Sequence, residues 1–542
     1  MLSLKYKLSI VIAALVIFCA MYGCKKNNND ITPLPDITIS ATTVSEKFIG
    51  DVLSINPTVA YGGQEANFTY KWFKTVQASS SLTVYKQISD KKALSYTLDS
   101  LGTLNLKFEV SNTVTGVSSF SKISFNVVSR AERGWYLLKA TADGNTEMDA
   151  FYTNAVGNQS VTNIITAKNG APMAGLPVDI GFTAFYTWYN PITKFFVSNN
   201  TCLIPVSSKE VLAYRVRDER ILSSTDGLFY EPPVPASRNF QALVCDPNLM
   251  GIVNDGAAQG MDPNSSSFLP QRSGDYSLSP YFTLAPYKFN NANVGYILGF
   301  DKKSASFVTL RYKQTDISYF PDRFLTGSKF SYPYNVSSNK MGAQLVFMGN
   351  TDGTLDSLQS SNGRAYGLLK KDNSSDMMLV GLNTELLLPS RYGNGNFSPI
   401  AFKRDLLSSS YPDLASASLF AINKNNPIIY FAKGSNLGYY NIDTQVYSSS
   451  MYNFGGEEIT YVKFIDAQYD AITANNFRNL VVATYLNGKY KVYRFTVLGT
   501  TLTQTGAVFE GTGRIKSLIY AVPNGNSTAT FTSLFHSMYR YY

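Results

Sequence analysis

The sequence contains one histidine, His536, among its 542 residues. One histidine cannot supply a zinc site built on several histidines, and a Ser-His-Asp or Cys-His catalytic arrangement would have to recruit this residue close to the chain end. No glycine-rich phosphate loop leads into a helix, because Gly455 and Gly456 lack the required spacing and context. We therefore expect no catalytic residue, no metal site and no cofactor.

Charged residues are also scarce, at 16% of the chain, and the formal net charge is +9. The positive residues are scattered, and acidic residues interrupt the densest cluster, which consists of Arg215, Arg217 and Arg220. Nucleic-acid binding usually requires a basic stripe with a matching motif. We therefore expect no nucleic-acid partner.

Long apolar runs are absent after residue 24, where no stretch reaches the about 18 residues that a membrane-spanning helix needs. The apolar run at residues 8–20 follows Lys5 and Lys7 and is too short to span a bilayer as a stable helix. A short basic start followed by such a run is the layout of a secretory signal. We predict a signal peptide at residues 1–23.

Cysteine is rare, with four residues, and Cys24 directly follows the small residue Gly23. This arrangement resembles the lipobox of bacterial lipoproteins. The resemblance implies cleavage before Cys24 and acylation of its sulfur and new amino group, which would anchor the protein to a membrane without spanning it. An ordinary signal peptide with an incidental cysteine is the alternative. Residues 24–35 are polar and then punctuated by proline, so we predict a tether.

Aromatic residues are abundant, with 37 Tyr and 34 Phe, and together with low charge they favour strands over helices. We predict an all-β protein whose residues 36–130 form an immunoglobulin-like sandwich of about seven short strands. Residues 68–73 and 104–110 alternate between apolar and polar side chains. Trp72 falls on the apolar face, and we predict that it lies in the core.

Several motifs together carry a family resemblance. The lipobox at Cys24, the tether, residues 70–73, residues 134–138 and residues 143–149 resemble the PKD-like lipoprotein family of Bacteroidetes. The resemblance implies an accessory role beside a Sus-type importer, in which a TonB-dependent barrel is capped by a substrate-binding lipoprotein lid. The Asp-Phe-Gly-Asp-Gly run of ordinary PKD domains is absent after Trp72, so the module is PKD-like rather than a standard PKD domain.

Residues 131–542 repeat a different pattern of apolar strand, polar turn and aromatic strand. The clearest copy joins residues 480–485 to residues 490–495 through Asn487-Gly488, which is a strong hairpin signal. Repeated hairpins of this kind predict a β-propeller. Seven blades fit the length, and six or eight are the alternatives. We expect the strand at Trp135 to pair with residues 515–520 and close the ring.

The densest aromatic run, residues 185–191, offers candidate ligand-binding residues. Tyr186 and Trp188 share one face of the predicted strand and Tyr189 lies on the other. A flat apolar ring with a polar edge suits a sugar ring or a protein partner. Core packing between blades is the alternative.

Outside the predicted signal peptide and Cys24, the chain has two further cysteines, Cys202 and Cys245. An exported protein meets conditions that permit disulfides. The sequence leaves open whether these two residues pair or remain buried free thiols, because it does not give their separation.

Carboxylates support the alternative functions. Residues 143–149 offer alternating oxygens, but their spacing misses the EF-hand loop, so we predict a hairpin turn rather than a calcium site. The 38 Asp and Glu residues leave open a propeller glycoside hydrolase or lyase that acts through paired carboxylates.

These observations lead to one functional expectation. We expect a non-catalytic lipoprotein, lipid-anchored at the outer membrane on the cell surface. It would act as an accessory subunit of a Sus-type TonB-dependent nutrient importer that binds a glycan or peptide ligand or docks on the importer. A purely structural docking subunit is the third possibility.

Overall fold

The computed structural model describes most of the chain between residues 35 and 521. The described ranges are 35–41, 47–62, 67–77, 83–132, 134–152, 159–192, 194–246, 249–262, 266–289, 292–310, 316–324, 336–351, 364–383, 397–423, 426–465 and 479–521. The predicted signal peptide, Cys24, nearly all of the tether and His536 lie outside them. None of the helices in the described part of the chain has the length and apolar character that a membrane crossing requires.

The chain divides into two units, Met1–Val128 and Ser129–Tyr542. The strands of the first unit are β1 (Ile37–Ser40), β2 (Lys47–Phe48), β3 (Val52–Ile55), β4 (Thr58–Tyr61), β5 (Phe68–Gln77), β6 (Thr83–Ser89), β7 (Leu94–Thr97), β8 (Gly102–Asn112) and β9 (Ser118–Val128). A five-stranded sheet has the order β2-β9-β8-β5-β6, and β1-β4 and β3-β7 form two-stranded sheets. The predicted all-β module is confirmed, with nine strands among its described residues rather than about seven.

Alternation along the strands builds the core of the first unit. On β8 the buried residues recur at every second position, while Lys107 and Glu109 face outward and pair at 2.8 Å. Trp72 on β5 is fully buried, with its ring centroid 4.5 Å from that of Phe108. Its indole N–H donates to the carbonyl of Lys92 at 3.2 Å. The prediction that Trp72 lies in the core is therefore confirmed.

The second unit consists of consecutive antiparallel sheets, and its described residues form seven of them. From the innermost strand outward, the first three are β38 (Arg514–Ala521), β10 (Gly134–Ala140), β11 (Thr146–Tyr152) and β12 (Gln159–Val161); β13 (Pro177–Asn190), β14 (Phe195–Ser207), β15 (Leu212–Arg215) and β16 (Arg220–Ser224); and β17 (Phe240–Asp246), β18 (Leu249–Asn254), β19 (Ala257–Asp262) and β20 (Ser267–Phe268).

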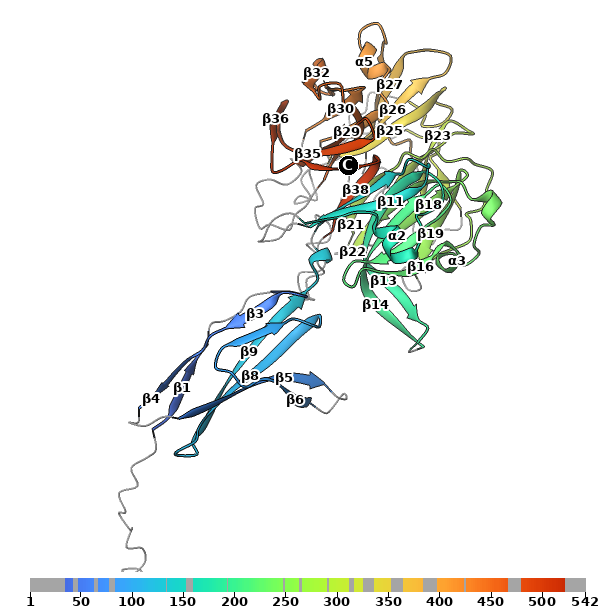
Figure 1. The fold of residues 1–542 in the computed structure, drawn as a ribbon. Helices are drawn as coiled ribbons and strands as arrows, with labels where there is room; N and C mark the ends of the chain where they lie inside the picture. Colours follow the sequence, from blue (N-terminus) through green and yellow to red (C-terminus); the bar gives the residue numbers. More distant parts are fainter. Residues whose placement is uncertain are drawn as a thin grey trace, which may run out of the picture. The chain divides into compact units, whose positions relative to one another are not determined.

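The next two sheets are β21 (Thr283–Phe289), β22 (Ala292–Asp301), β23 (Ser306–Leu310) and β24 (Ser318–Tyr319); and β25 (Ala343–Thr351), β26 (Arg364–Lys371), β27 (Met377–Asn383) and β28 (Ile400–Leu406). The last two are β29 (Leu419–Ile422), β30 (Ile428–Lys433), β31 (Asn436–Asn441) and β32 (Tyr447–Asn453); and β33 (Glu458–Phe464), β34 (Asn479–Leu486), β35 (Lys489–Leu498) and β36 (Thr501–Gln504), with β37 (Phe509–Thr512) also paired to β35. Short helices lie between strands at α2 (Ile164–Asn169), α3 (Thr225–Leu228) and α5 (Pro412–Ala415). This arrangement is a β-propeller (Figure 1).

Strands from both ends of the second unit share the first sheet. β10 pairs with β11 on one side and with β38 on the other, and Trp135 lies opposite Tyr520. The predicted closure through these two strands is confirmed. Closure removes sheet edges that would otherwise offer unpaired backbone groups to other chains.

The turn at Asn487-Gly488 also forms as predicted. Leu486 lies opposite Lys489 on β34 and β35, and both turn residues have positive φ, 50° and 81°. A two-residue turn of this type needs φ above zero at both central positions, which asparagine and glycine tolerate. The two residues therefore fix the register of the hairpin.

A buried polar network joins the first sheet to the last. The Lys139 ammonium lies 2.7 Å from the Asp149 carboxylate, and these side chains are 3% and 0% exposed. The hydroxyl of Tyr490, on β35, donates to the same carboxylate at 2.8 Å. Residues 141–145 form the β10–β11 turn, where Gly144 N–H donates to Thr141. The predicted hairpin turn at residues 143–149 is thus confirmed for its first part, and Asp149 is a structural residue.

Candidate functional site

A cavity of about 350 Å³ lies at the centre of the propeller, where the innermost strands of all seven sheets meet. Its lining comes from β13, β17, β25, β29, β33 and β38 and from residues 280–283 at the start of β21. We call it the central channel. Each sheet presents a short stretch to it, so side chains distant in sequence converge there.

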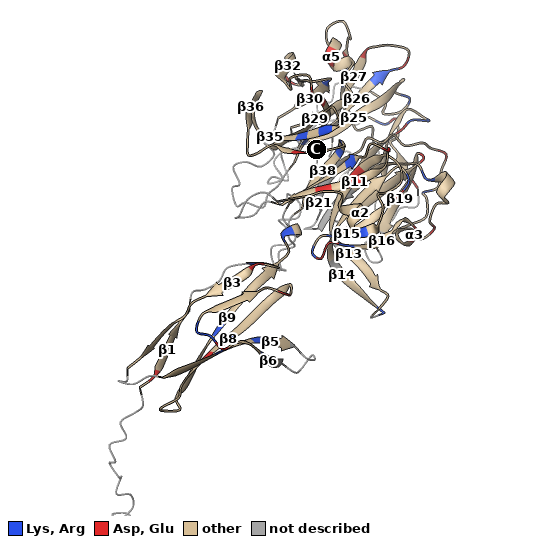
Figure 2. Cartoon of the chain, viewed as in Figure 1, with Lys and Arg blue, Asp and Glu red and all other residues tan. Residues whose placement is uncertain are grey.

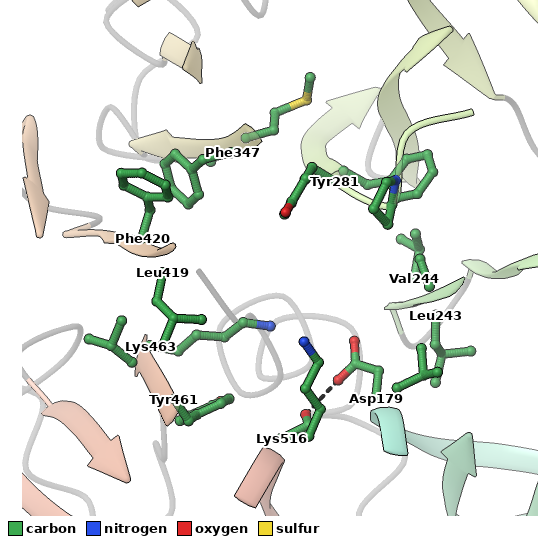
Figure 3. A pocket seen from close by; sticks show the side chains of 18 of the residues that line it. Asp179, Leu243, Val244, Tyr281, Phe347, Leu419, Phe420, Tyr461, Lys463 and Lys516 are labelled. Atoms are coloured by element: carbon green, nitrogen blue, oxygen red, sulfur yellow. Dashed lines mark hydrogen bonds between the residues drawn. The ribbon is translucent and has the colours of Figure 1, made fainter. Parts of the chain in front are cut away.

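Three charged side chains reach into the central channel. Lys463 on β33, Lys516 on β38 and Asp179 on β13 extend toward its middle (Figure 3). The hydroxyl of Ser517 donates to the Asp179 carboxylate at 2.5 Å. Within the described residues, neither lysine has a carboxylate at ion-pair distance, and the Lys463 ammonium lies 5.9 Å from the ring centroid of Tyr461.

Aromatic side chains form the opposite side of the central channel. Tyr281 is 39% exposed and its hydroxyl points into the cavity (Figure 3). Burial raises the pKa of Tyr281, so the hydroxyl stays protonated and can donate a hydrogen bond at neutral pH. Phe347 and Phe420 pack against each other at 5.8 Å between ring centroids. The channel therefore combines an apolar wall with two ammonium groups and one carboxylate.

Carboxylates are scarce in the described lining of the central channel. Glycoside hydrolysis uses two positioned carboxylates. Asp179 is the one carboxylate among the described residues that line the central channel.

Figure 2 also shows Lys and Arg dispersed over the described parts of both units without a continuous basic stripe.

The structure places two of the predicted platform residues in the core. Tyr186 is buried, and Trp188 is 7% exposed. The guanidinium groups of Arg215 and Arg220 lie 5.4 and 5.1 Å from the centroid of the Trp188 ring. The prediction of a ligand platform at Tyr186 and Trp188 is corrected on this ground, because burial and cation–π contacts within the chain leave no ring face for a ligand.

Tyr189 belongs to a different feature, an exposed apolar hairpin end. The hairpin of β13 and β14 extends beyond its neighbouring strands (Figure 1). Its large apolar side chains are between 36% and 79% exposed, and they are Tyr189, Ile192, Phe195, Phe196 and Val197. We call these five residues the hairpin tip. Tyr189 packs on Phe196 at 5.3 Å between centroids, so the tip is a contiguous apolar surface.

The pairing that the sequence leaves open is settled for Cys202, which forms no disulfide. Cys202 is a free, fully buried cysteine on β14, packed among apolar residues that include Phe240 and Ile252. Burial raises the pKa of its thiol, which keeps it protonated and unreactive. Cys245 lies on β17, in the next sheet. The alternative of a buried free thiol therefore holds for Cys202.

The comparison with family models supports the resemblance seen in the sequence. Residues 25–177 match the model described as the PKD-like family. The match covers residues 25–128 of the first unit and continues through β10, β11, β12 and α2 of the second unit. No curated protein sequence matches the chain.

Solved structures with propeller domains resemble the chain only distantly. A quinonprotein alcohol dehydrogenase-like protein from Bacteroides thetaiotaomicron is 11% identical, with a TM-score of 0.38 over 90% of this chain and 99% of that one. The WD40 domain of SCAP from fission yeast is 10% identical, with a TM-score of 0.33 over 54% of this chain and 60% of that one. The propeller assignment therefore rests on the strand pairing of this chain itself.

Proposed function

We propose that this chain, whose residues 25–177 match the PKD-like family, is a non-catalytic lipoprotein on the outer-membrane surface that serves a Sus-type TonB-dependent importer. The lipobox-like sequence at Cys24 supports the anchor. The PKD-like match supports the association, because the resemblance to that family implies importers of this type. The protein would capture a nutrient ligand for the importer or dock on it.

The central channel is the observation that carries the binding role. It has the size of a small-molecule site and combines apolar walls with a few convergent polar groups, which is the usual composition of such sites. Its described lining supplies a single carboxylate, Asp179, whereas hydrolysis needs two. This composition supports a binding role over turnover.

The hairpin tip supports the docking role. Contiguous exposed apolar side chains with aromatic members are typical of protein interfaces. The tip has five such residues, and Lys194 is the charged residue next to them. A partner surface that covers Phe195 and Phe196 would remove these rings from water, which favours association.

The test of docking is an affinity pull-down of the intact lipoprotein from detergent-solubilised outer membranes, analysed by mass spectrometry. We expect recovery of a TonB-dependent barrel and its lid. The double variant Phe195→Ser/Phe196→Ser should lose them, whereas Phe120→Ser, which changes an exposed ring of the first unit, should retain them. Recovery of the lipoprotein alone from membranes that contain the barrel would overturn the importer role.

The anchor has a separate test. Cys24→Ala should release the protein from the membrane fraction, because lipid attachment needs the cysteine sulfur. If the variant still fractionates with the envelope, the anchoring proposal fails. Turnover of any polysaccharide by the purified protein would instead favour the glycoside hydrolase or lyase.

A further inference from the structure

Irregular pairing recurs around the central channel. Five of the seven innermost strands each contain a register shift that passes over one residue beside the channel. The residues passed over are Val178, Gln241, Val346, Thr460 and Lys516. All five line the channel. β-bulges are frequent beside functional sites, where they redirect side chains.

One of these bulges, in β38, lies at a lysine that lines the channel. Leu138 pairs with Ser517 and Lys139 pairs with Ile515, so Lys516 has no direct partner on β10. Ile515 and Ser517 are both buried, whereas Lys516 is exposed. Alternation along the strand gives Lys516 the opposite face to its two buried neighbours, and the bulge leaves no residue of β10 opposite it.

The neighbouring innermost strand adds a second ammonium group. Lys463 on β33 extends toward the same region as Lys516 (Figure 3). Two ammonium groups in one cavity, without a carboxylate partner among the described residues, repel each other unless an anion lies between them. A bound carboxylate would relieve this repulsion and accept hydrogen bonds from both.

The rest of the lining narrows the class of anion. Asp179 lies in the same cavity and would repel a multiply charged phosphate, but it can accept hydrogen bonds from hydroxyl groups. The exposed ring of Tyr281 offers an apolar face with a polar edge. A ligand that fits all of these groups has a carboxylate, several hydroxyls and an apolar ring face.

We propose that the central channel binds a carboxylated saccharide, with Lys463 and Lys516 on the carboxylate and Asp179 and Tyr281 on the hydroxyls and ring. This inference rests on the proposed ligand-binding function and specifies its ligand class. The cavity volume of about 350 Å³ suits one or two sugar rings at the end of a chain.

The test is isothermal titration calorimetry of the full-length protein with uronic-acid oligosaccharides. The probes are di- to tetrasaccharides from polygalacturonate, alginate and chondroitin, each before and after reduction of its carboxyl groups to alcohols. We expect at least one acidic probe to bind and its reduced form to bind about tenfold to hundredfold more weakly, because a hydrogen bond to a charged group is lost.

Variants assign the effect to the channel. Lys516→Gln and Lys463→Gln should each weaken binding of the acidic probe about tenfold, and Lys516→Arg should retain most of it. Lys370→Gln is the matched control, since Lys370 is an exposed lysine on β26 outside the channel lining. It should bind as the unchanged protein does.

The outcomes separate this inference from the proposed function. Equal binding of acidic and reduced probes, unchanged by Lys516→Gln, would overturn the carboxylate assignment and leave a glycan-binding protein. Stronger binding of hexaglutamate or inorganic phosphate than of every uronic-acid probe would overturn the saccharide class. Failure of every saccharide and peptide probe to bind would overturn the ligand-binding function as well.

Discussion

The two units of the chain bury different kinds of side chain in their interiors. Among the described residues of the first unit, Asn112 is the one buried polar side chain in a core of alternating apolar residues. The second unit buries charged residues as well, including Lys139, Glu147 and Asp149. The described interior of the sandwich therefore contains no buried charged side chain, whereas the propeller has a charge pair in its interior.

The difference follows from what each fold must specify. A sandwich needs one apolar face on each sheet, and alternation along the strands supplies it. A propeller has several similar sheets and must bring its first and last sheets together in one register. Asp149 bonds to Lys139 within the first sheet and to Tyr490 in the last. We interpret this network as a specificity device, because buried ion pairs contribute little net stability but penalise wrong partners.

Asp149→Ala should cause the largest effect, because it leaves the Lys139 ammonium buried without a counter-charge. Such a loss typically costs about 3–5 kcal/mol of unfolding free energy. Tryptophan fluorescence can follow urea denaturation of the propeller alone if Trp72 in the first unit is replaced by phenylalanine. The two remaining tryptophans, Trp135 and Trp188, both lie in the propeller. The propeller transition should move to lower urea.

A matched double variant distinguishes charge from packing. Lys139→Met/Asp149→Leu removes both charges and should recover most of the stability lost by Asp149→Ala. If Asp149→Ala lowers the unfolding free energy by less than about 1 kcal/mol, the buried pair does not hold the first and last sheets together. The proposed difference between the interiors of the two units would then be wrong.

Asp301→Asn should have the next largest effect, and the effect depends on pH. Burial raises the pKa of Asp301, but hydrogen bonds from Ser304, the backbone N–H groups of Ser277 and Lys303, and Tyr319 outweigh it and hold the pKa below its usual value. At neutral pH we expect a loss of about 1–3 kcal/mol, because bonds to a charged acceptor are weakened.

The sign of the pH effect follows from the lowered pKa. The ionised form is favoured in the folded state, so its stabilisation is present above the unfolded-state pKa of about 4 and is lost as the pH falls through the folded-state pKa. Denaturation at a series of pH values should show a shallower acid loss in Asp301→Asn than in the unchanged protein. Parallel curves would contradict the assignment.

Tyr490→Phe tests the link between the first and last sheets with a smaller change. The variant removes one hydrogen bond to Asp149 while Lys139 remains, so we expect a loss of about 1 kcal/mol. Tyr461→Phe, which loses a bond to the uncharged carbonyl of Leu518, should cost less in the same denaturation experiment. A larger loss for Tyr461→Phe would show that the charge on Asp149 is unimportant.

Glu109→Gln in the first unit should have the smallest effect. Its partner Lys107 is partly exposed, at 24%, and ion pairs in such positions contribute about 0.2–1 kcal/mol. Salt titration of the sandwich transition should remove most of the difference. A loss as large as that of Asp149→Ala would erase the distinction between the two units.

The sequence predicts the parts of the fold that depend on local alternation and turn chemistry. Alternating side chains predict the burial of Trp72, Asn487-Gly488 predicts its hairpin, and the strand at Trp135 finds its partner at residues 515–520. The first two follow from a period or a turn residue that is visible in a short window, and the third follows from the expectation that a propeller closes its ring.

The candidate site could not be predicted from local patterns of this kind, for two physical reasons. Alternation shows that Tyr186 and Trp188 share a face, but not that Arg215 and Arg220 cover it. Alternation likewise shows that Lys516 lies on the face opposite Ile515 and Ser517, but not that this face lines the central channel. The bulge at Lys516 depends on the pairing of β38 with β10, which is distant in sequence.

The first sheet contains strands from both ends of the second unit, and this affects the order in which the sheets can form during synthesis. Sheets two to seven are each made of consecutive strands, so each can pair soon after it leaves the ribosome. Within the second unit β10, β11 and β12 are made first, yet β10 cannot complete its pairing until β38, the last strand of the described residues, has emerged. Until then β10 keeps an open edge that can recruit another chain. The protein therefore most needs a chaperone in the time between the emergence of β10 and the emergence of β38.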